Sequence, residues 1–159
     1  MAKWIDEIAN AEQTKQAMAD AREQEAIAAG LKVSAEAPEY WRQLVIELRE
    51  VARGLSEKPN LHISASVSDN SEPEVENRVR VQVLMTTTMP DSTYTDLLHR
   101  IDQHFIRCHT PGGTAYNLRF AVRRDSNAIG VYAENGRGEI LTPAQAARYI
   151  VEPMVRQYL

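Results

Sequence analysis

Residues able to bind a metal ion or to carry acid–base chemistry gather in one short stretch, between residues 99 and 109. The stretch holds three histidines, an aspartate and the single cysteine of the chain, at His99, Asp102, His104, Cys108 and His109. Metals in proteins prefer such ligands, and histidine and cysteine also serve as acid, base or nucleophile. This stretch is therefore the first candidate for a reactive site.

The spacing of these residues argues against their acting together. The pattern of apolar residues predicts a helix over 93–106, on which His99 shares a face with Asp102, because only positions three or four apart meet. His104 shares a different face with Cys108. The spacing matches no established metal or nucleophile signature. We therefore predict no catalytic residue, no metal site and no cofactor, with a small-ligand or metal-dependent enzyme using these four side chains as the alternative.

A second set of polar side chains follows from two-residue alternation in residues 61–67, 78–85 and 118–123, as in half-buried strands. If these strands share a sheet, one face collects His62, Ser64, Ser66, Arg78, Arg80, Gln82, Arg119 and Arg123. Every Lys or Arg after Lys58 is an arginine, whose planar group suits carboxylates and phosphates. The face could receive an acidic partner segment, a phosphorylated ligand or single-stranded nucleic acid.

The alternative for this face is a solvated surface whose arginines pair with acids of the loop between the first two strands, Glu72, Glu74 and Glu76. Two properties argue against nucleic acid. The net charge is −4, and Tyr132 is the only obvious aromatic side chain for base stacking near the face. Nucleic-acid binding is therefore a second alternative and not the expected function.

The first sixty residues predict two helices. Residues 3–29 are rich in Ala, Glu, Gln and Lys and contain neither Gly nor Pro. Their apolar stripe is thin, with Trp4 and Ile8 among its few large side chains, so this helix is expected to project or to pack on a second copy. Residues 30–38, which begin with glycine and end with proline, are expected to connect it to a core helix at 39–53.

The expected fold is α+β: two N-terminal helices, then a mostly antiparallel sheet of about five strands, with a C-terminal helix packed on one face. The sheet is expected as a hairpin, the helix at 93–106 and a meander of three strands at 118–123, 129–133 and 139–141. The last helix is expected to start at Thr142 and to kink or break at Pro153. Residues 1–35 are expected to form a helix and connector beside a single domain of residues 36–159.

The composition, 43% hydrophobic and 25% charged, is that of an ordinary globular protein. The chain shows neither the pattern of a signal peptide nor the roughly 20 apolar residues that cross a bilayer. A single cysteine gives no intrachain disulfide, which favours a reducing, cytoplasmic location. In size, acidity and alternation of hairpins with helices, the chain resembles small acidic secretion chaperones of bacteria.

The expected function is that of a non-enzymatic protein-interaction or adaptor module, chaperone-like and homodimeric. Its partner is expected to be another protein chain or a second copy of this one. No association with a membrane is expected. The expected contacts lie on the sheet face, at Arg78, Arg80, Arg119, Arg123 and His62, and on the first helix, at Trp4 and Ile8.

Overall fold

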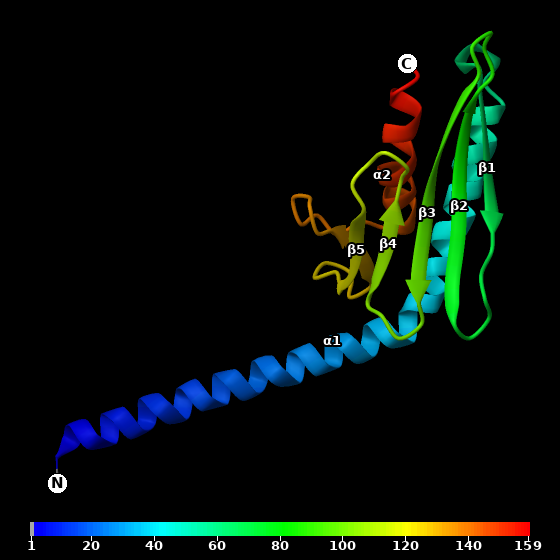
Figure 1. Cartoon of the computed structure of the whole chain (residues 1–159). Helices are drawn as coiled ribbons and strands as arrows, with labels where there is room; N and C mark the ends of the chain where they lie inside the picture. The colour runs from blue at the N-terminus through cyan, green and yellow to red at the C-terminus, as the bar shows by residue number, and fades with distance from the viewer. Residues whose placement is uncertain (1) are drawn as a thin grey trace.

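Two helices lie on one face of a six-stranded antiparallel sheet (Figure 1). The computed structural model describes residues 2–159. Its elements are α1 (Lys3–Ser56), a 3₁₀ turn η1 (Pro59–Leu61), β1 (Ile63–Asp69), β2 (Glu76–Met85), β3 (Asp91–Arg100), β4 (Phe105–His109), β5 (Tyr116–Val122), β6 (Ile129–Ala133) and α2 (Pro143–Arg156). The strands follow one another across the sheet in chain order. The α+β class and the antiparallel sheet are therefore confirmed.

Helix α1 is one continuous helix of 54 residues, so the prediction of two helices with a connector is wrong. Gly30 and Pro38 both lie inside it. A proline within a helix removes one backbone donor and crowds the carbonyl four residues earlier, which bends the helix where packing holds it in place. The helix changes direction where its colour passes from blue to cyan, in the part that contains Pro38 (Figure 1).

The predicted helix at 93–106 is also wrong, because these residues form most of β3, a turn and the start of β4. All ten residues of β3 pair with β2. Thr95, Leu97 and His99 point into the core with a period of two. The ladder between β2 and β3 gives hydrogen-bond partners to the backbone N–H and C=O groups of β3, and the β-branched threonines of β3 favour a strand. The change adds two strands, and because the strand expected at 139–141 is reduced to an isolated bridge, the sheet has six strands and not the expected five.

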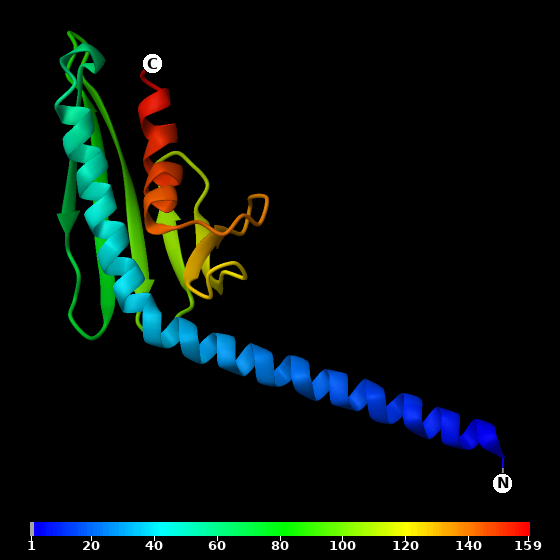
Figure 2. The same ribbon diagram turned by 180° about the vertical axis from the view of Figure 1, so that it is seen from behind.

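The core lies between the inner face of the sheet and the two helices (Figure 2). The side chains that the sheet buries completely include Val79, Val81, Val83, Leu97, Ile106, Leu118 and Val131. Leu44 and Leu48 of α1, with Ile150 of α2, belong to the same cluster. Burying a side chain of this size contributes about 1.5–3 kcal/mol, so this cluster decides which face of each strand turns inward.

The start of α2 agrees with the prediction. Oγ1 of Thr142 accepts a hydrogen bond from the backbone N–H of Gln145 at 3.3 Å. The Gln145 side chain accepts one from the N–H of Thr142 at 2.9 Å. The pair is a capping box, which satisfies two backbone donors that a helix leaves open at its N-terminus.

The same helix runs without a break through Pro153 to Arg156, so of the two outcomes expected there, a kink or a break, the break is wrong. Glu152 accepts hydrogen bonds from Arg148 and Arg156, one helical turn to either side. These bonds lower the pKa of Glu152 to about 2. The ion pairs span the proline and the apolar face packs on the sheet, so the loss of one backbone hydrogen bond does not end the helix.

Both edges of the sheet are partly covered. At the β6 edge, Leu141 forms an isolated bridge with Val131, so residue 141 is the paired part of the strand expected at 139–141. Here the chain passes close to Gly130, where a Cβ would lie 2.5 Å from Cγ2 of Ile140. At the β1 edge, Oγ of Ser56 accepts a hydrogen bond from the N–H of Ala65 at 3.0 Å.

Candidate functional site

The outer face of the sheet carries three of the arginines that the alternation assigns to it. Arg78 and Arg80 of β2 alternate with buried valines, and Arg119 of β5 lies between buried Leu118 and Phe120. Arg107 of β4 joins them. Arg107 is absent from the predicted set because it directly follows the helix expected at 93–106, and no strand is expected there. The outer face therefore presents four arginines from three strands.

Arg80 is already paired within this face. Its guanidinium group donates to both carboxylate oxygens of Asp96, at 2.8 and 3.0 Å. Asp96 stands directly opposite on β3. The guanidinium carbon also lies 3.8 Å from the centre of the Tyr94 ring. The hydrogen bonding to Asp96 raises the pKa of Arg80, so this arginine stays charged and held in place.

Two further arginines are paired as well. Nε of Arg119 lies 2.9 Å from a carboxylate oxygen of Glu134, and Nη2 of Arg78 lies 3.2 Å from one of Glu76. Among the described residues, Glu76 is the only one of the three predicted loop acids that forms such a pair. Arg107 forms no ion pair with any residue of 2–159. The face is thus largely neutralised by its own acids, and an anionic ligand would have to displace them.

Arg123 and His62 do not belong to this face. Arg123 follows the last residue of β5 and pairs with Asp125 at 3.2 Å, in the turn that leads to β6. His62 lies between η1 and β1 with a left-handed backbone, φ 54°. Two-residue alternation places a side chain only while the strand continues, and both residues stand just outside one.

The N-terminal part of α1 extends away from the rest of the molecule as an arm, residues 3–28 (Figures 1 and 2). Every side chain of the arm is exposed, and the first buried side chain of α1 is Val33. Trp4 is 62% exposed and Ile8 is 56% exposed. They stand one helical turn apart and form an apolar stripe, a feature that marks interaction surfaces on soluble proteins.

The base of the arm rests on the turn between β3 and β4. Oγ of Ser34 lies 3.1 Å from Nε2 of His104. A Cβ placed on Gly30 would lie 3.8 Å from Cε1 of the same histidine, so the helix passes close to the ring. The turn therefore supports α1 where it leaves the sheet.

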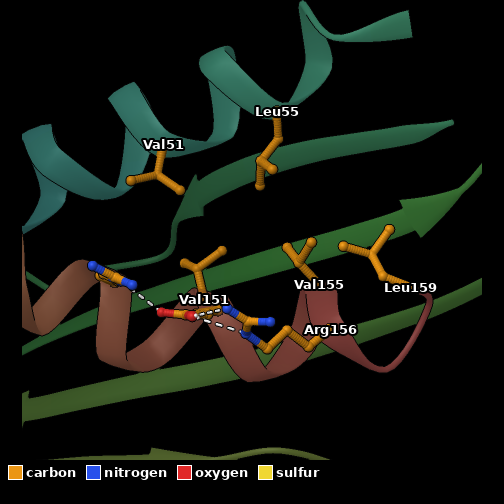
Figure 3. Close-up of a pocket in the computed structure, with 8 residues that line it drawn as sticks. Val51, Leu55, Val151, Val155, Arg156 and Leu159 are labelled. Atoms are coloured by element: carbon orange, nitrogen blue, oxygen red, sulfur yellow. Dashed lines mark hydrogen bonds and ion pairs between the residues drawn. The ribbon is translucent and has the colours of Figure 1, made fainter. Parts of the chain in front are cut away.

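A groove opens between α1 and α2, near the end of α1 opposite the arm (Figure 3). It has a volume of about 400 Å³. Its lining consists of Val51 and Leu55 on α1 and of Arg148, Val151, Glu152, Val155, Arg156 and Leu159 on α2 and the residues after it. The floor and walls are apolar, while Glu152 and its two arginines form the rim on the α2 side (Figure 3). Such a groove suits an apolar side chain or an amphipathic helix.

The four side chains of the alternative, an enzyme that uses His99, Asp102, His104 and Cys108, occupy different environments in the structure. His99 and Cys108 lie on neighbouring strands and point into the core, with exposed fractions of 3% and 0%. Nε2 of His99 lies 2.9 Å from the carbonyl oxygen of Gln103, and its Nδ1 has no hydrogen-bond partner among the described residues. His104 contacts Ser34, and Asp102 lies in the turn.

This arrangement gives little support to a reactive site. Within residues 2–159, no three His, Cys, Asp or Glu side chains lie close enough together to hold a metal ion. Burial raises the pKa of the Cys108 thiol to about 12. A buried thiol with such a pKa is protonated at neutral pH and is a poor nucleophile.

No protein-family model, no curated protein and no solved structure matches this chain. The interpretation of its surfaces therefore depends on the geometry described above. Neither of the helices in residues 2–159 is both long and apolar enough to cross a bilayer. The three surfaces that remain are the outer face of the sheet, the arm and the groove between α1 and α2.

Proposed function

We propose that this protein is a non-enzymatic protein-interaction module that holds another protein chain through its arm. The observation that carries the proposal is the apolar stripe of the arm, where Trp4 and Ile8 are both more than half exposed. The sheet and α2 form the body to which the arm is fixed. An amphipathic helix that lays its apolar side into a groove is a common mode of protein recognition.

The energetics favour the arm as the interacting element. Burying a side chain as large as tryptophan or isoleucine contributes about 1.5–3 kcal/mol, and in the free molecule neither side chain gives this contribution. Helix formation in isolation is marginal in water, but the arm continues a helix whose second half is packed on the sheet. The arm is therefore ordered before it meets a partner, which lowers the entropic cost of binding.

The outer face of the sheet is a weaker candidate, although its arginines were expected to hold the partner. Three of its arginines already pair with acids of the same molecule, Asp96, Glu134 and Glu76. A binding partner would lose part of its interaction energy in separating these pairs. We assign this face a supporting role.

We place the module in a reducing, cytoplasmic setting. The support is the free and fully buried cysteine, Cys108. The buried thiol and imidazole give no support to an enzyme that uses the stretch around them. The paired arginines give none to nucleic-acid binding.

The experiment compares the full chain with two double variants. Trp4→Ala with Ile8→Ala removes the apolar stripe, whereas Asn10→Ala with Gln13→Ala changes the opposite side of the same helix. Alanine is a strong helix former, so circular dichroism should show an intact arm in both. Proteins that cross-link to the wild-type chain in its source cells should be captured at least tenfold less by the first variant and equally well by the second. Equal capture by all three chains would show that the arm binds no partner.

A further inference from the structure

We infer that the groove between α1 and α2 receives the arm of a second copy of this chain, so that two molecules exchange arms. The inference rests on the proposed function, in which the arm is the interacting element. It adds the surface on which the arm binds and the identity of one partner.

The groove and the arm share the same helical spacing. Each wall of the groove presents apolar side chains four residues apart: Val51 and Leu55 on α1, and Val151 and Val155 on α2 (Figure 3). Trp4 and Ile8 have the same separation on the arm. Residues four apart stand about 5–6 Å from one another along a helix. The side chains of the arm can therefore fit between those of the two groove walls, because all three helices present them at the same spacing.

The charges beside the apolar stripe of the arm are acidic. At about 100° per residue, Glu7 and Glu12 fall on opposite sides of the line through Trp4 and Ile8. Across residues 3–28, three Lys or Arg stand against six Asp or Glu. Near its tip the arm therefore presents Trp4 and Ile8 between two acids, and Lys15 stands on the same line two turns further along the helix.

The α2 rim of the groove offers the complementary charges. Arg148 and Arg156 stand two helical turns apart and share a single internal partner, Glu152. Each guanidinium group has five N–H donors and uses only part of them on that carboxylate. An acid of an incoming arm can bind there without displacing Glu152, and the opposite charges guide the two surfaces together.

The arm of the same molecule cannot fill this groove. Trp4 and Val51 lie on the same helix, 47 positions apart in the chain, which is about 70 Å measured along the helix axis at a rise of about 1.5 Å per residue. The arm leads away from α2, which forms one wall of the groove, in both views (Figures 1 and 2). A second copy carries the matching stripe, and reciprocal insertion makes two identical contacts that close under twofold symmetry.

Cross-linking tests the contact directly. Cys108 is fully buried, so thiols introduced at the surface react without competition from it. Leu159, at one end of the groove, is 72% exposed, so we expect its substitution to leave the fold intact. The full chain with both Ile8→Cys and Leu159→Cys, treated with a short thiol cross-linker at micromolar concentration, should give a covalent dimer. Each single variant should stay monomeric on a denaturing gel.

Two results would overturn the exchange. A covalent dimer from Ile8→Cys alone would show that the arms pair with each other. The absence of a covalent dimer from the doubly substituted chain would show that arm and groove do not meet.

Light scattering supplies the independent readout. The wild-type chain should have the mass of a dimer, and Asn10→Ala with Gln13→Ala should keep it. Trp4→Ala with Ile8→Ala, and separately Leu159→Glu, should raise the dissociation constant of the dimer at least tenfold. A monomeric wild-type chain would contradict the exchange of arms. The proposed function would still hold if the variant with Trp4→Ala and Ile8→Ala lost its cellular partners. If the stripe variant changed neither mass nor capture, both would fail.

Discussion

The phenol of Tyr40 on α1 donates a 2.9 Å hydrogen bond to the carbonyl oxygen of Leu141, which lies just before α2. Both residues are buried, and the Tyr40 ring meets Phe120 edge to face with 5.5 Å between ring centres. Burial raises the pKa of the Tyr40 hydroxyl, which stays protonated and able to donate. The bond ties the centre of α1 to the segment that leads into the other helix.

Tyr40→Phe keeps the ring and removes this donor. The Leu141 carbonyl still accepts from the N–H of Val131 at 3.1 Å, so we expect a loss of about 1 kcal/mol in the free energy of unfolding. Urea denaturation measures it. Tyr132→Phe, on the outer face, is the matched control and should change stability by less than about 0.5 kcal/mol. Equal effects in the two variants would mean that the bond contributes nothing.

Two glycine substitutions should act in opposite directions. At Gly130 a Cβ would lie 2.5 Å from Ile140 Cγ2 and 2.7 Å from the carbonyl oxygen of Leu141, so the chain beside β6 must move. Gly130→Ala should therefore destabilise the fold by about 1–3 kcal/mol. At Gly54 a Cβ meets nothing within 4 Å, and alanine is the better helix former. Gly54→Ala should stabilise by up to about 1 kcal/mol. Thermal unfolding of both variants gives the two signs, and a Gly130→Ala variant that is not destabilised would contradict the packing described at β6.

Stability should fall as the pH drops below neutral because of His99. Burial lowers the pKa of His99, while the Gln103 carbonyl and nearby Asp102 partly oppose this and His104 adds to it. The unfolded chain takes up a proton near pH 6.5 that the folded chain refuses, so the free energy of unfolding decreases as pH falls through this range.

Urea denaturation at intervals from pH 8 to pH 5 measures this dependence. In a His99→Gln variant, the slope of the free energy of unfolding against pH comes from all other titratable groups. The wild-type slope should be steeper between about pH 7 and pH 5. Parallel slopes would show that His99 is protonated as easily in the folded chain as in the unfolded one.

The Arg80–Asp96 pair should couple weakly despite its two hydrogen bonds. Side-chain exposures of 43% and 33% leave both groups in contact with water, which screens the interaction. A double-mutant cycle with Arg80→Ala and Asp96→Ala should give a small coupling free energy that declines in concentrated salt. A coupling that salt leaves unchanged would show that the pair is less exposed to solvent than its side-chain areas indicate.

Much of the fold could be predicted where a pattern is local and unambiguous. The alternation around Val79, Val81 and Val83 identified β2, and the Thr142–Gln145 spacing identified the start of α2. The segment of β3 misled the prediction because Leu97 and Leu98 fit a helical stripe as well as a strand. Its ladder with β2, which the pattern of a single segment does not reveal, decides between the two.

The same distinction holds for the candidate sites: features that follow from a local pattern could be predicted, and features that depend on contacts between elements could not. Alternation was enough to place Arg78, Arg80 and Arg119 on one face of the sheet. Their acidic partners depend on strand register, and the register follows from turns and burial that no single strand reveals. The groove between α1 and α2 was out of reach, because it exists only once Val51 and Val155 come together.

Ser56 gives the β1 edge of the sheet a protection of its own. An open edge strand is a template for strands of other molecules, and sheets that grow at their edges end as fibres. The N–H of Ala65, near the middle of β1, is already bonded to the Ser56 hydroxyl. A strand that approached from outside would find that donor taken and the end of α1 in its path. The β1 edge therefore offers one backbone donor fewer to a strand of another molecule, at the position where strand addition would otherwise begin in register.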